Sequence, residues 1–244
     1  MDVDTRLAED WVRAIAAAVE REHERLTELD SAIGDGDHGS NLRRGFTAVL
    51  AVLDSPDSPD SPDSPDSPSG PSGPAAPAPD GGPGALLTRT GSTLISKVGG
   101  ASGPLYGKAF RAIGAALPPP GQPPADAAGL GEALAAGLRA VRDLGRAAPG
   151  DKTLVDAWTP ALDAYREAVA AGAGLPEAAA AAAGGAERGA LDTVPLEARK
   201  GRASYLGPRS VGHQDPGARS TALLFHALAE TTAARAAEHP GEPA

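Results

Sequence analysis

The sequence predicts an all-α protein. Its apolar residues are mostly alanine and leucine, and aromatic residues make up only 3% of the chain. Runs of β-branched residues, which favour strands, are nearly absent. Apolar residues also recur every three or four positions through most of the chain, as on the buried face of an amphipathic helix. Alanine and leucine are strong helix formers, so composition and periodicity agree on the fold class.

Eight stretches carry this helical pattern. The first covers residues 5–29, where Leu7, Trp11 and Ile15 lie on one face, and the second follows it around Leu42 to Leu53. The others cover residues 85–97, 103–117, 126–146, 153–171, 176–190 and 217–237. Eight amphipathic helices with mostly short connections predict an eight-helix antiparallel up-and-down bundle or barrel.

One segment does not fit the helical pattern. Residues 54–84 read DSPDSPDSPDSPDSPSGPSGPAAPAPDGGPG, with six aspartates and no basic residue. A Ser-Pro-Asp period fits neither helix nor strand, and the segment has little to bury, so we predict a disordered, partly polyproline-like insert in a helix–helix loop. Proline-directed phosphorylation of its Ser-Pro steps is one reading, and a tolerated low-complexity expansion is the simpler one. A shorter proline-rich break covers residues 118–124.

Length and composition limit the remaining possibilities. With 244 residues and 41% hydrophobic content, residues 1–244 are expected to form a single domain around one core. The chain has no cysteine, which excludes disulfides, thiolate zinc sites and a cysteine nucleophile. A net charge of −10 argues against binding to nucleic acid. The N-terminus resembles no signal peptide and no long apolar run occurs, so we expect a cytoplasmic protein that does not bind a membrane.

The most informative loop follows the first predicted helix. It reads LDSAIGDGDHGSNL (residues 29–42) and holds Asp30, Asp35, Asp37 and His38 among glycines. Its GDGDHG matches a dinucleotide-binding glycine pattern by letter, but a helix precedes it where a strand is required. An EF-hand is excluded as well, because the twelfth position from Asp35 is not glutamate.

The surviving interpretation of this loop is a site for a hard cation. Three carboxylates about 4 Å apart repel one another by roughly 4 kcal/mol per pair at an effective dielectric near 20, so a cation would stabilise them. Mg²⁺ prefers oxygen ligands and keeps coordination positions for phosphates, so a nucleotide could bind through it. In the alternative reading, Asp30 ends a helix, Asp35 and Asp37 accept turn amides, and His38 is a solvated loop residue.

Three more loops contain glycine, basic residues or both. Residues 96–110 (SKVGGASGPLYGKAF) place small residues before a helix, where a ligand could reach free amides. In residues 148–158 (APGDKTLVDAW) the simplest reading is a helix cap with Lys152 exposed. Residues 198–220 hold Arg199, Lys200, Arg202 and Arg209, followed by Asp215-Pro216, which is typical of a helix start. Alternate loops of an up-and-down bundle meet at one end, so all four loops should converge.

Taken together, these loops resemble one family. The motifs AIGDGDHGSN, GGASGPLYG, GDKTLVDA and ARKGRASYLGPRSVGHQDPGA occur in an order and spacing similar to those of the DhaL family, the nucleotide-binding subunits of dihydroxyacetone kinases. The resemblance covers nearly the whole chain outside the insert. It implies an eight-helix antiparallel barrel that binds ADP (or ATP) and two Mg²⁺ ions per chain at one end. The insert departs from the family and should lie at the opposite end.

The resemblance also implies roles for particular residues. Asp30, Asp35 and Asp37 would ligate magnesium, and these three with Arg202 would be the catalytic residues. The implied nucleotide contacts are His38, Gly39, Ser40, Asn41, Ala101, Ser102, Gly150, Arg202, Asp215, Pro216 and Gly217. Family members commonly carry another small residue at the position of Ser40, a difference we expect to be silent.

The resemblance implies a phosphotransferase that works with partner subunits. A DhaM-like phosphohistidine protein, supplied by phosphoenolpyruvate, would convert bound ADP to ATP, and a DhaK-like substrate-binding subunit would hold dihydroxyacetone. The family further suggests a homodimer. Two alternatives stay open. One is an ATP-exchanging kinase subunit for dihydroxyacetone or a related keto-sugar, and the other is a non-catalytic nucleotide-binding regulator of a transcription factor.

Overall fold

The computed structural model describes residues 1–54 and 81–238, and within these ranges the fold is helical. The elements are α1 (Thr5–Ile33), α2 (His38–Asp54), α3 (Gly82–Lys97), α4 (Ser102–Ala116), α5 (Ala127–Gly145), α6 (Leu154–Ala170), α7 (Leu175–Asp192), the 3₁₀ helix η1 (Arg202–Ser210) and α8 (Pro216–Glu238). Apart from one isolated bridge between Val3 and Ala125, the described residues form no β-structure. The all-α prediction is therefore confirmed.

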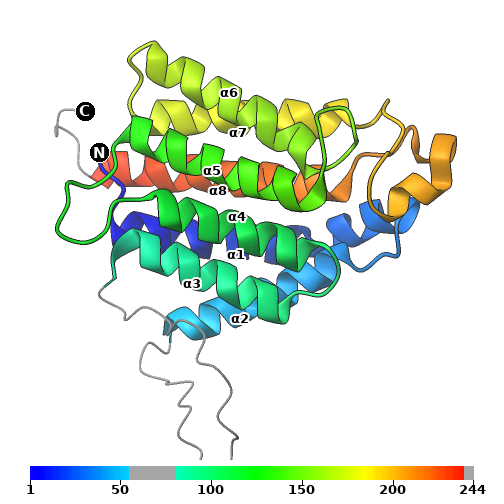
Figure 1. Cartoon of the computed structure of the whole chain (residues 1–244), viewed down its shortest axis with the longest axis horizontal. Helices are drawn as coiled ribbons and strands as arrows, with labels where there is room; N and C mark the ends of the chain where they lie inside the picture. Colours follow the sequence, from blue (N-terminus) through cyan, green and yellow to red (C-terminus); the bar gives the residue numbers. More distant parts are fainter. Residues whose placement is uncertain (55–80, 239–244) are drawn as a thin grey trace, which may run out of the picture.

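The α-helices run back and forth along the long axis of the molecule (Figure 1). Each helix packs against the next one in the chain, and α8 also packs against α1. Because the direction alternates, the α1–α2, α3–α4, α5–α6 and α7–α8 connections lie together at one end, as expected. We call this the pocket end, and we call the opposite end, which carries the α4–α5 and α6–α7 connections, the far end.

Sequence signals at the helix starts explain several of the observed boundaries. The side chains of Asp4 and Asp126 cap α1 and α5 by accepting from the amides of Leu7 (2.7 Å) and Gly129 (2.8 Å). Thr153 caps α6 in a reciprocal pair with Asp156. Such caps satisfy amides that have no partner inside the helix, so they fix where the helix begins.

One hydrophobic core runs between the helices. Trp11 and Phe46 both contact Phe110, with ring centroids 5.8 Å and 6.4 Å away, while Trp158 meets Phe225 edge-on at 5.6 Å. The alanine-rich helix α7 packs closely on α6, and a Cβ at Gly185 would collide with the Pro160 carbonyl. Small residues thus serve close helix packing, which explains a core with few aromatic side chains.

The predicted helix boundaries need two corrections. Helix α1 continues to Ile33, beyond the predicted end at residue 29, so Asp30 lies on its last turn and not in the loop. Asp54 and residues 82–84, which we assigned to the insert, belong to α2 and α3. The two helix ends that flank the insert lie away from the pocket end (Figure 1). The predicted disorder itself falls on residues 55–80, outside the described residues.

The sequence also led us to expect no membrane-spanning helix. None of the described helices combines the length and the hydropathy that a membrane span requires.

Candidate functional site

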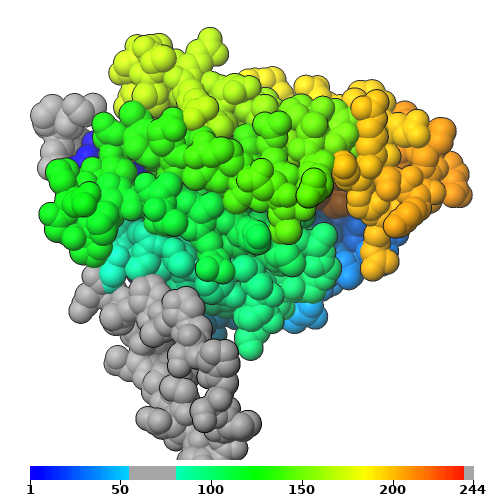
Figure 2. Space-filling model, in the orientation of Figure 1, coloured from blue at the N-terminus to red at the C-terminus, as the bar shows by residue number. Residues whose placement is uncertain are grey.

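A cavity of about 350 Å³ opens at the pocket end, where all four connections meet. Its volume lies within the range typical of small-molecule sites. Residues from each predicted loop line it, including Asp30, Asp35, Asp37, His38, Ala101, Ser102, Lys200, Arg202, Asp215, Pro216 and Gly217. The α7–α8 connection, orange in Figure 2, projects beyond the helices at this end. Segments far apart in the sequence therefore form one site, as the alternation of helix directions predicted.

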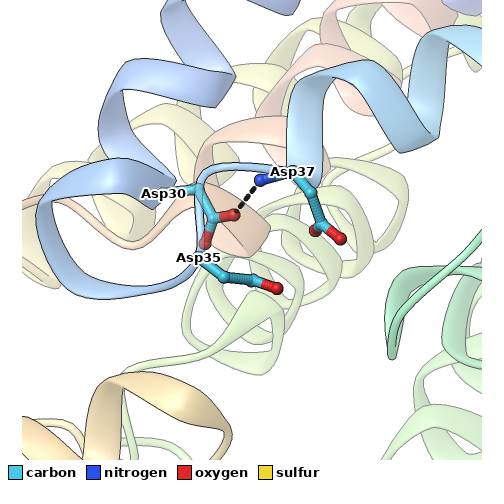
Figure 3. Close-up of side chains that lie close together, drawn as sticks. All are labelled: Asp30, Asp35 and Asp37. Carbon is cyan, nitrogen blue, oxygen red and sulfur yellow. Dashed lines mark hydrogen bonds between the residues drawn. The ribbon is translucent and has the colours of Figure 1, made fainter.

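The aspartate loop brings three carboxylates together (Figure 3). One oxygen from each of Asp30, Asp35 and Asp37 lies within 4.8 Å of the others. Asp30 is only 9% exposed, and its Oδ2 accepts hydrogen bonds from the amides of Asp37 (2.8 Å) and His38 (3.1 Å). Asp30 therefore orders the loop with Oδ2, while its Oδ1 accepts no hydrogen bond from the described residues. The loop therefore has the carboxylate cluster of the cation-site interpretation, and also carboxylate–amide bonds of the kind in the alternative interpretation, although Asp30 is the acceptor.

Two glycines make this loop possible. A Cβ at Gly34 would overlap the Asp30 carboxylate, and one at Gly36 would approach the Ser31 hydroxyl to 2.5 Å. Gly36 also has a φ of 74°, which side chains disfavour. The spacing of glycine and aspartate in GDGD thus lets the chain turn tightly enough to gather its carboxylates.

The arrangement of charges suits a hard cation. All three ligand groups are carboxylates, the donor type that Mg²⁺ prefers. The only basic side chain paired with them in the described residues is Arg202, whose Nη2 lies 3.2 Å from Asp35 Oδ2. This pair is weak, because the Arg202 side chain is 69% exposed. The Arg202 charge therefore lies largely in solvent at the edge of the carboxylate cluster.

His38 is the first residue of α2, and its side chain is buried. The alternative interpretation, in which His38 is a solvated loop residue, is therefore wrong on this point. Its Nε2 lies 2.8 Å from the Ser220 hydroxyl and its Nδ1 lies 2.9 Å from the Ser102 hydroxyl. Burial lowers the pKa of His38 to about 4, against the opposing effect of the nearby Asp30 and Asp37. The ring is therefore neutral at pH 7 and held on both sides by hydroxyls.

Tyr106, to which the sequence analysis assigned no role, completes this network. Its hydroxyl lies 2.7 Å from Ser220 Oγ and 2.9 Å from Thr221 Oγ1, and it donates to the Gly217 carbonyl at 3.1 Å. Burial raises the pKa of Tyr106 to about 12, so the hydroxyl stays protonated. Four hydroxyls and one imidazole thus connect α4, α2 and α8 beneath the cavity. The polar cluster Ser220-Thr221 inside an apolar helix was the available signal.

Asp215 begins α8 as predicted. Its Oδ2 accepts from the amide of Ala218 at 2.7 Å, and Pro216 is the first helical residue. Burial raises the pKa of Asp215 to about 7. The Ala218 bond and the Lys152 charge lower this pKa, while Asp156 and Asp30 raise it. The carboxyl group is therefore poised to hold a proton near neutral pH, which is typical of functional sites.

Four of the predicted nucleotide contacts do not line the cavity. Gly39 packs on α1, where a Cβ would strike the His23 carbonyl. The hydroxyl of Ser40 donates to the Asp37 carbonyl, and Asn41 accepts from Arg44 at 2.8 Å. Gly150 has a φ of 91° and donates to Asp156 at 2.5 Å. Gly39, Ser40 and Asn41 lie in the first turn of α2 and Gly150 in the α5–α6 connection, and their contact with a nucleotide stays a prediction.

The expected exposure of Lys152 is wrong. Its side chain is buried, with 1% of the residue exposed, and burial lowers its pKa. Its Nζ donates to main-chain carbonyls of the α7–α8 connection. A lysine after GD looked like a surface residue because those acceptors lie far away in the sequence. The helix cap at Thr153 is as expected.

The chain is similar to known proteins over most of its length. The family model described as the DAK2 domain matches residues 75–230. The chain is 38% identical over 220 residues to the ADP-binding subunit DhaL of the phosphoenolpyruvate-dependent dihydroxyacetone kinase of Escherichia coli, covering 90% of this chain and 93% of that subunit. It is 36% identical over 231 residues to a corresponding subunit of Listeria innocua, covering 95% and 98% of the two chains.

Among solved structures, the fold resembles the dihydroxyacetone kinase of C. freundii in complex with AMP-PNP and Mg²⁺. The TM-score is 0.62 at 25% identity, and the match covers 95% of this chain but only 35% of the kinase. The chain therefore spans about a third of that enzyme. The matched domain, the relatives matched over nearly their whole length and the helical fold agree: the chain belongs to the DhaL family of dihydroxyacetone kinase subunits.

Proposed function

We propose that this protein is the cytoplasmic ADP-binding subunit of a phosphoenolpyruvate-dependent dihydroxyacetone kinase. The observation that carries the proposal is the group of three carboxylates at a cavity to which four loops contribute. The similarity to the E. coli subunit over 93% of its length supports the same activity. In this proposal, a phosphoryl group moves from a phosphohistidine protein through the bound nucleotide to dihydroxyacetone.

The residues present fit a nucleoside diphosphate bound through Mg²⁺, and the proposal includes two Mg²⁺ ions per chain. Asp30, Asp35 and Asp37 supply only oxygen ligands, and the Asp30 oxygen that accepts no loop amide is available. Two divalent ions would reduce the repulsion between these carboxylates and the phosphates. When bound, the metal–nucleotide complex supplies the phosphoryl carrier and neutralises charge in the transfer.

The chain's own residues bind and orient the nucleotide. The N-termini of α4, at Ala101 and Ser102, and of α8, at Pro216 and Gly217, border the cavity; Pro216 has no N–H, so the main-chain amides that would face an anion include those of Ser102 and Gly217. Lys200 and Arg202 add positive charge at the same rim. His38, neutral and fixed between two hydroxyls, positions the metal loop beside them. It is a positioning residue in this scheme and forms no phosphorylated intermediate.

The partners in this proposal follow from the subunit assignment. A DhaK-like subunit would present dihydroxyacetone to the pocket end, and a DhaM-like phosphohistidine protein would use the same end to renew the nucleotide. We also propose a homodimer, as the family resemblance suggests. The ATP-exchanging kinase subunit and the non-catalytic regulator are the outcomes that a direct experiment separates from this scheme.

The first experiment is to denature the purified protein, identify any released nucleotide by chromatography, and count nucleotide and magnesium per chain. Near-stoichiometric ADP with about two Mg²⁺ supports a resident nucleotide renewed by a phosphohistidine protein. An empty protein that binds ATP weakly and reversibly favours the ATP-exchanging kinase. Tight nucleotide binding without phosphoryl transfer, when partner subunits are added, favours the regulator.

The metal loop is tested with Asp35→Ala. This change removes one ligand at an exposed position, so we expect loss of metal-dependent nucleotide retention with the fold intact. Asp163→Ala removes another exposed carboxylate, from α6, and is the matched control, expected to retain nucleotide. Unchanged retention in Asp35→Ala, measured as ADP per chain after gel filtration, would contradict the metal-loop assignment.

A further inference from the structure

Lys152 carries an ionisable group that has no role in the proposed phosphoryl transfer. It lies in the α5–α6 connection between Gly150 and the start of α6, with a φ of 62° and 1% of its surface exposed. An unpaired ammonium in such a place would be strongly destabilising. In the structure, main-chain carbonyl oxygens surround it instead. The role of Lys152 is therefore to be sought in the segment that carries those carbonyls.

The Nζ of Lys152 donates to carbonyls on both limbs of the α7–α8 connection. On the limb that leaves α7, the acceptors are Thr193 (2.9 Å) and Leu196 (3.0 Å). On the limb that returns to α8, they are Ser210 (2.8 Å) and His213 (2.5 Å). A single nitrogen with three protons is thus shared among four acceptors. Charge-assisted bonds of this kind are stronger than neutral ones, particularly away from water.

The segment between the two limbs forms one wall of the cavity. It contains Lys200, Gly201, Arg202 and Ala203, all of which line the pocket. A second contact fixes it, since the amide of Arg199 donates to the Asp151 carbonyl at 3.0 Å. Two consecutive residues of the α5–α6 connection, Asp151 and Lys152, therefore hold the base of this wall.

This geometry separates Lys152 from the groups that would touch a ligand. Its side chain borders the cavity, but its nitrogen is occupied by the four carbonyls. Arg202, by contrast, is 69% exposed and carries its charge at the rim. The buried cation determines where the connection lies, and the exposed cation on that connection meets the solvent.

We infer that Lys152 is a positioning residue: by joining both limbs of the α7–α8 connection, it holds the segment of Lys200 to Ala203 against the nucleotide cavity. The inference rests on the proposed function for the identity of the ligand. It goes beyond that function because it assigns the order of this wall to one buried ammonium group. A prepositioned wall binds more tightly, since the ordering has been completed before the ligand arrives.

The test uses Lys152→Met in the full chain, which keeps the length of the side chain but removes the donor. Two readouts are compared, the rate of trypsin cleavage after Arg199, Lys200 or Arg202, and the Kd for ADP with Mg²⁺. We expect cleavage to accelerate, and we expect the Kd to rise by about ten- to a hundredfold, as for outer partners of a metal site. Lys152→Arg keeps the charge on a wider head group, and we expect intermediate values.

Tyr165→Phe is the matched control. It removes a buried hydroxyl that donates to the Ala127 carbonyl at 2.8 Å, at the far end of the bundle. Both variants should lose stability, but only the change at Lys152 should alter cleavage and ADP affinity. If Lys152→Met and Tyr165→Phe had equal effects on the two readouts, Lys152 would contribute only to the overall stability of the fold, and the inference would be overturned.

Chemical rescue gives a test that a merely structural role would not pass. Lys152→Ala removes the propylammonium portion of the side chain, so added propylammonium should restore slow cleavage and ADP binding, whereas propanol should not. Equal effects of the two additives would contradict the role of the charge. If wild type binds no ADP at all, the proposed function fails, and the cleavage readout alone then decides whether Lys152 holds the wall.

Discussion

The two ends of the helical bundle are built from different interactions. At the pocket end, buried polar side chains bond one another or the loops, as in the His38, Ser220 and Tyr106 network and at Lys152. At the far end, the contacts include a backbone hydrogen bond, the Tyr165 hydroxyl bonded to a main-chain carbonyl, and an ion pair. Val3 donates to the Ala125 carbonyl at 2.8 Å, and Arg235 pairs with the cap residue Asp4.

This difference shows that the pocket end buries ionisable groups at a cost in folding free energy. Burial shifts the pKa of His38 down and that of Asp215 up, and both groups lie beside the cavity. Desolvating an ionisable group is unfavourable, so a purely structural helix bundle would place apolar residues there. At the far end, burial raises the pKa of Tyr165, so this hydroxyl stays neutral, and the far end is the internal reference for the predictions about the pocket end.

The largest expected difference comes from removing one aspartate at each end. Asp30→Ala leaves the amides of Asp37 and His38 without an acceptor and removes a carboxylate ligand, so we expect loss of bound Mg²⁺ and ADP with about 1–3 kcal/mol of destabilisation. Asp126→Ala removes only a helix cap and should cost about 0.5–2 kcal/mol with ligand content unchanged. Urea unfolding and ligand counting check both. Retained magnesium in Asp30→Ala would break the comparison.

The next effect is on the pH dependence of the free energy of unfolding, measured on metal-free, nucleotide-free protein. Two groups contribute to it with opposite signs. The pKa of Asp215 is raised from 3.8 to about 7, so its contribution to folding becomes unfavourable as the pH rises through that window. The pKa of His38 is lowered from 6.5 to about 4, so its contribution becomes unfavourable as the pH falls. The two slopes oppose each other in wild type.

Single variants should therefore expose each slope. Relative to wild type, Asp215→Asn should gain free energy of unfolding as the pH rises from about 4 to 7, because the neutral amide keeps the cap without the charge. His38→Gln should gain as the pH falls from about 6.5 to 4. Urea titrations across this range measure both. A difference from wild type that does not change with pH would mean that the native group titrates as it does in the unfolded chain.

The smallest effect concerns two exposed arginines. Arg202 pairs with Asp35 at 3.2 Å at the pocket end, and Arg166 pairs with Glu132 at 2.8 Å away from it. Because both pairs are largely exposed, Arg202→Gln and Arg166→Gln should each change stability by less than about 1 kcal/mol. Only Arg202→Gln should weaken ADP binding, by up to about fivefold, as calorimetry can determine. Equal ADP affinity in the two variants would remove Arg202 from the site.

Prediction from the sequence succeeded where the signal was local. The periodicity of apolar residues located eight helices, and Asp215-Pro216 marked the start of α8. The glycine-separated aspartates indicated a carboxylate cluster, because the turn that gathers them lies within a few residues. Convergence of the four loops followed from counting helices, since direction alternates in an up-and-down bundle.

Prediction failed where a partner lies far along the chain. Lys152 looked exposed because its acceptors begin 41 residues later, and Tyr106 looked like an ordinary helix residue because its partners are on α8. The 3₁₀ helix Arg202–Ser210 was missed as well, because glycine and proline at 207 and 208 resemble a plain loop. Local patterns carry no information about such contacts.

By itself, the sequence determined which segments are helical, where several of them begin, and that three carboxylates gather at one tight turn. These features depend on side-chain periodicity, capping and backbone freedom within a few residues. Only the tertiary structure decided that His38 is neutral, that Asp215 holds a proton near neutral pH, and that Lys152 joins two limbs of another connection. Burial and long-range hydrogen bonds set these properties, and both arise only when distant helices pack together.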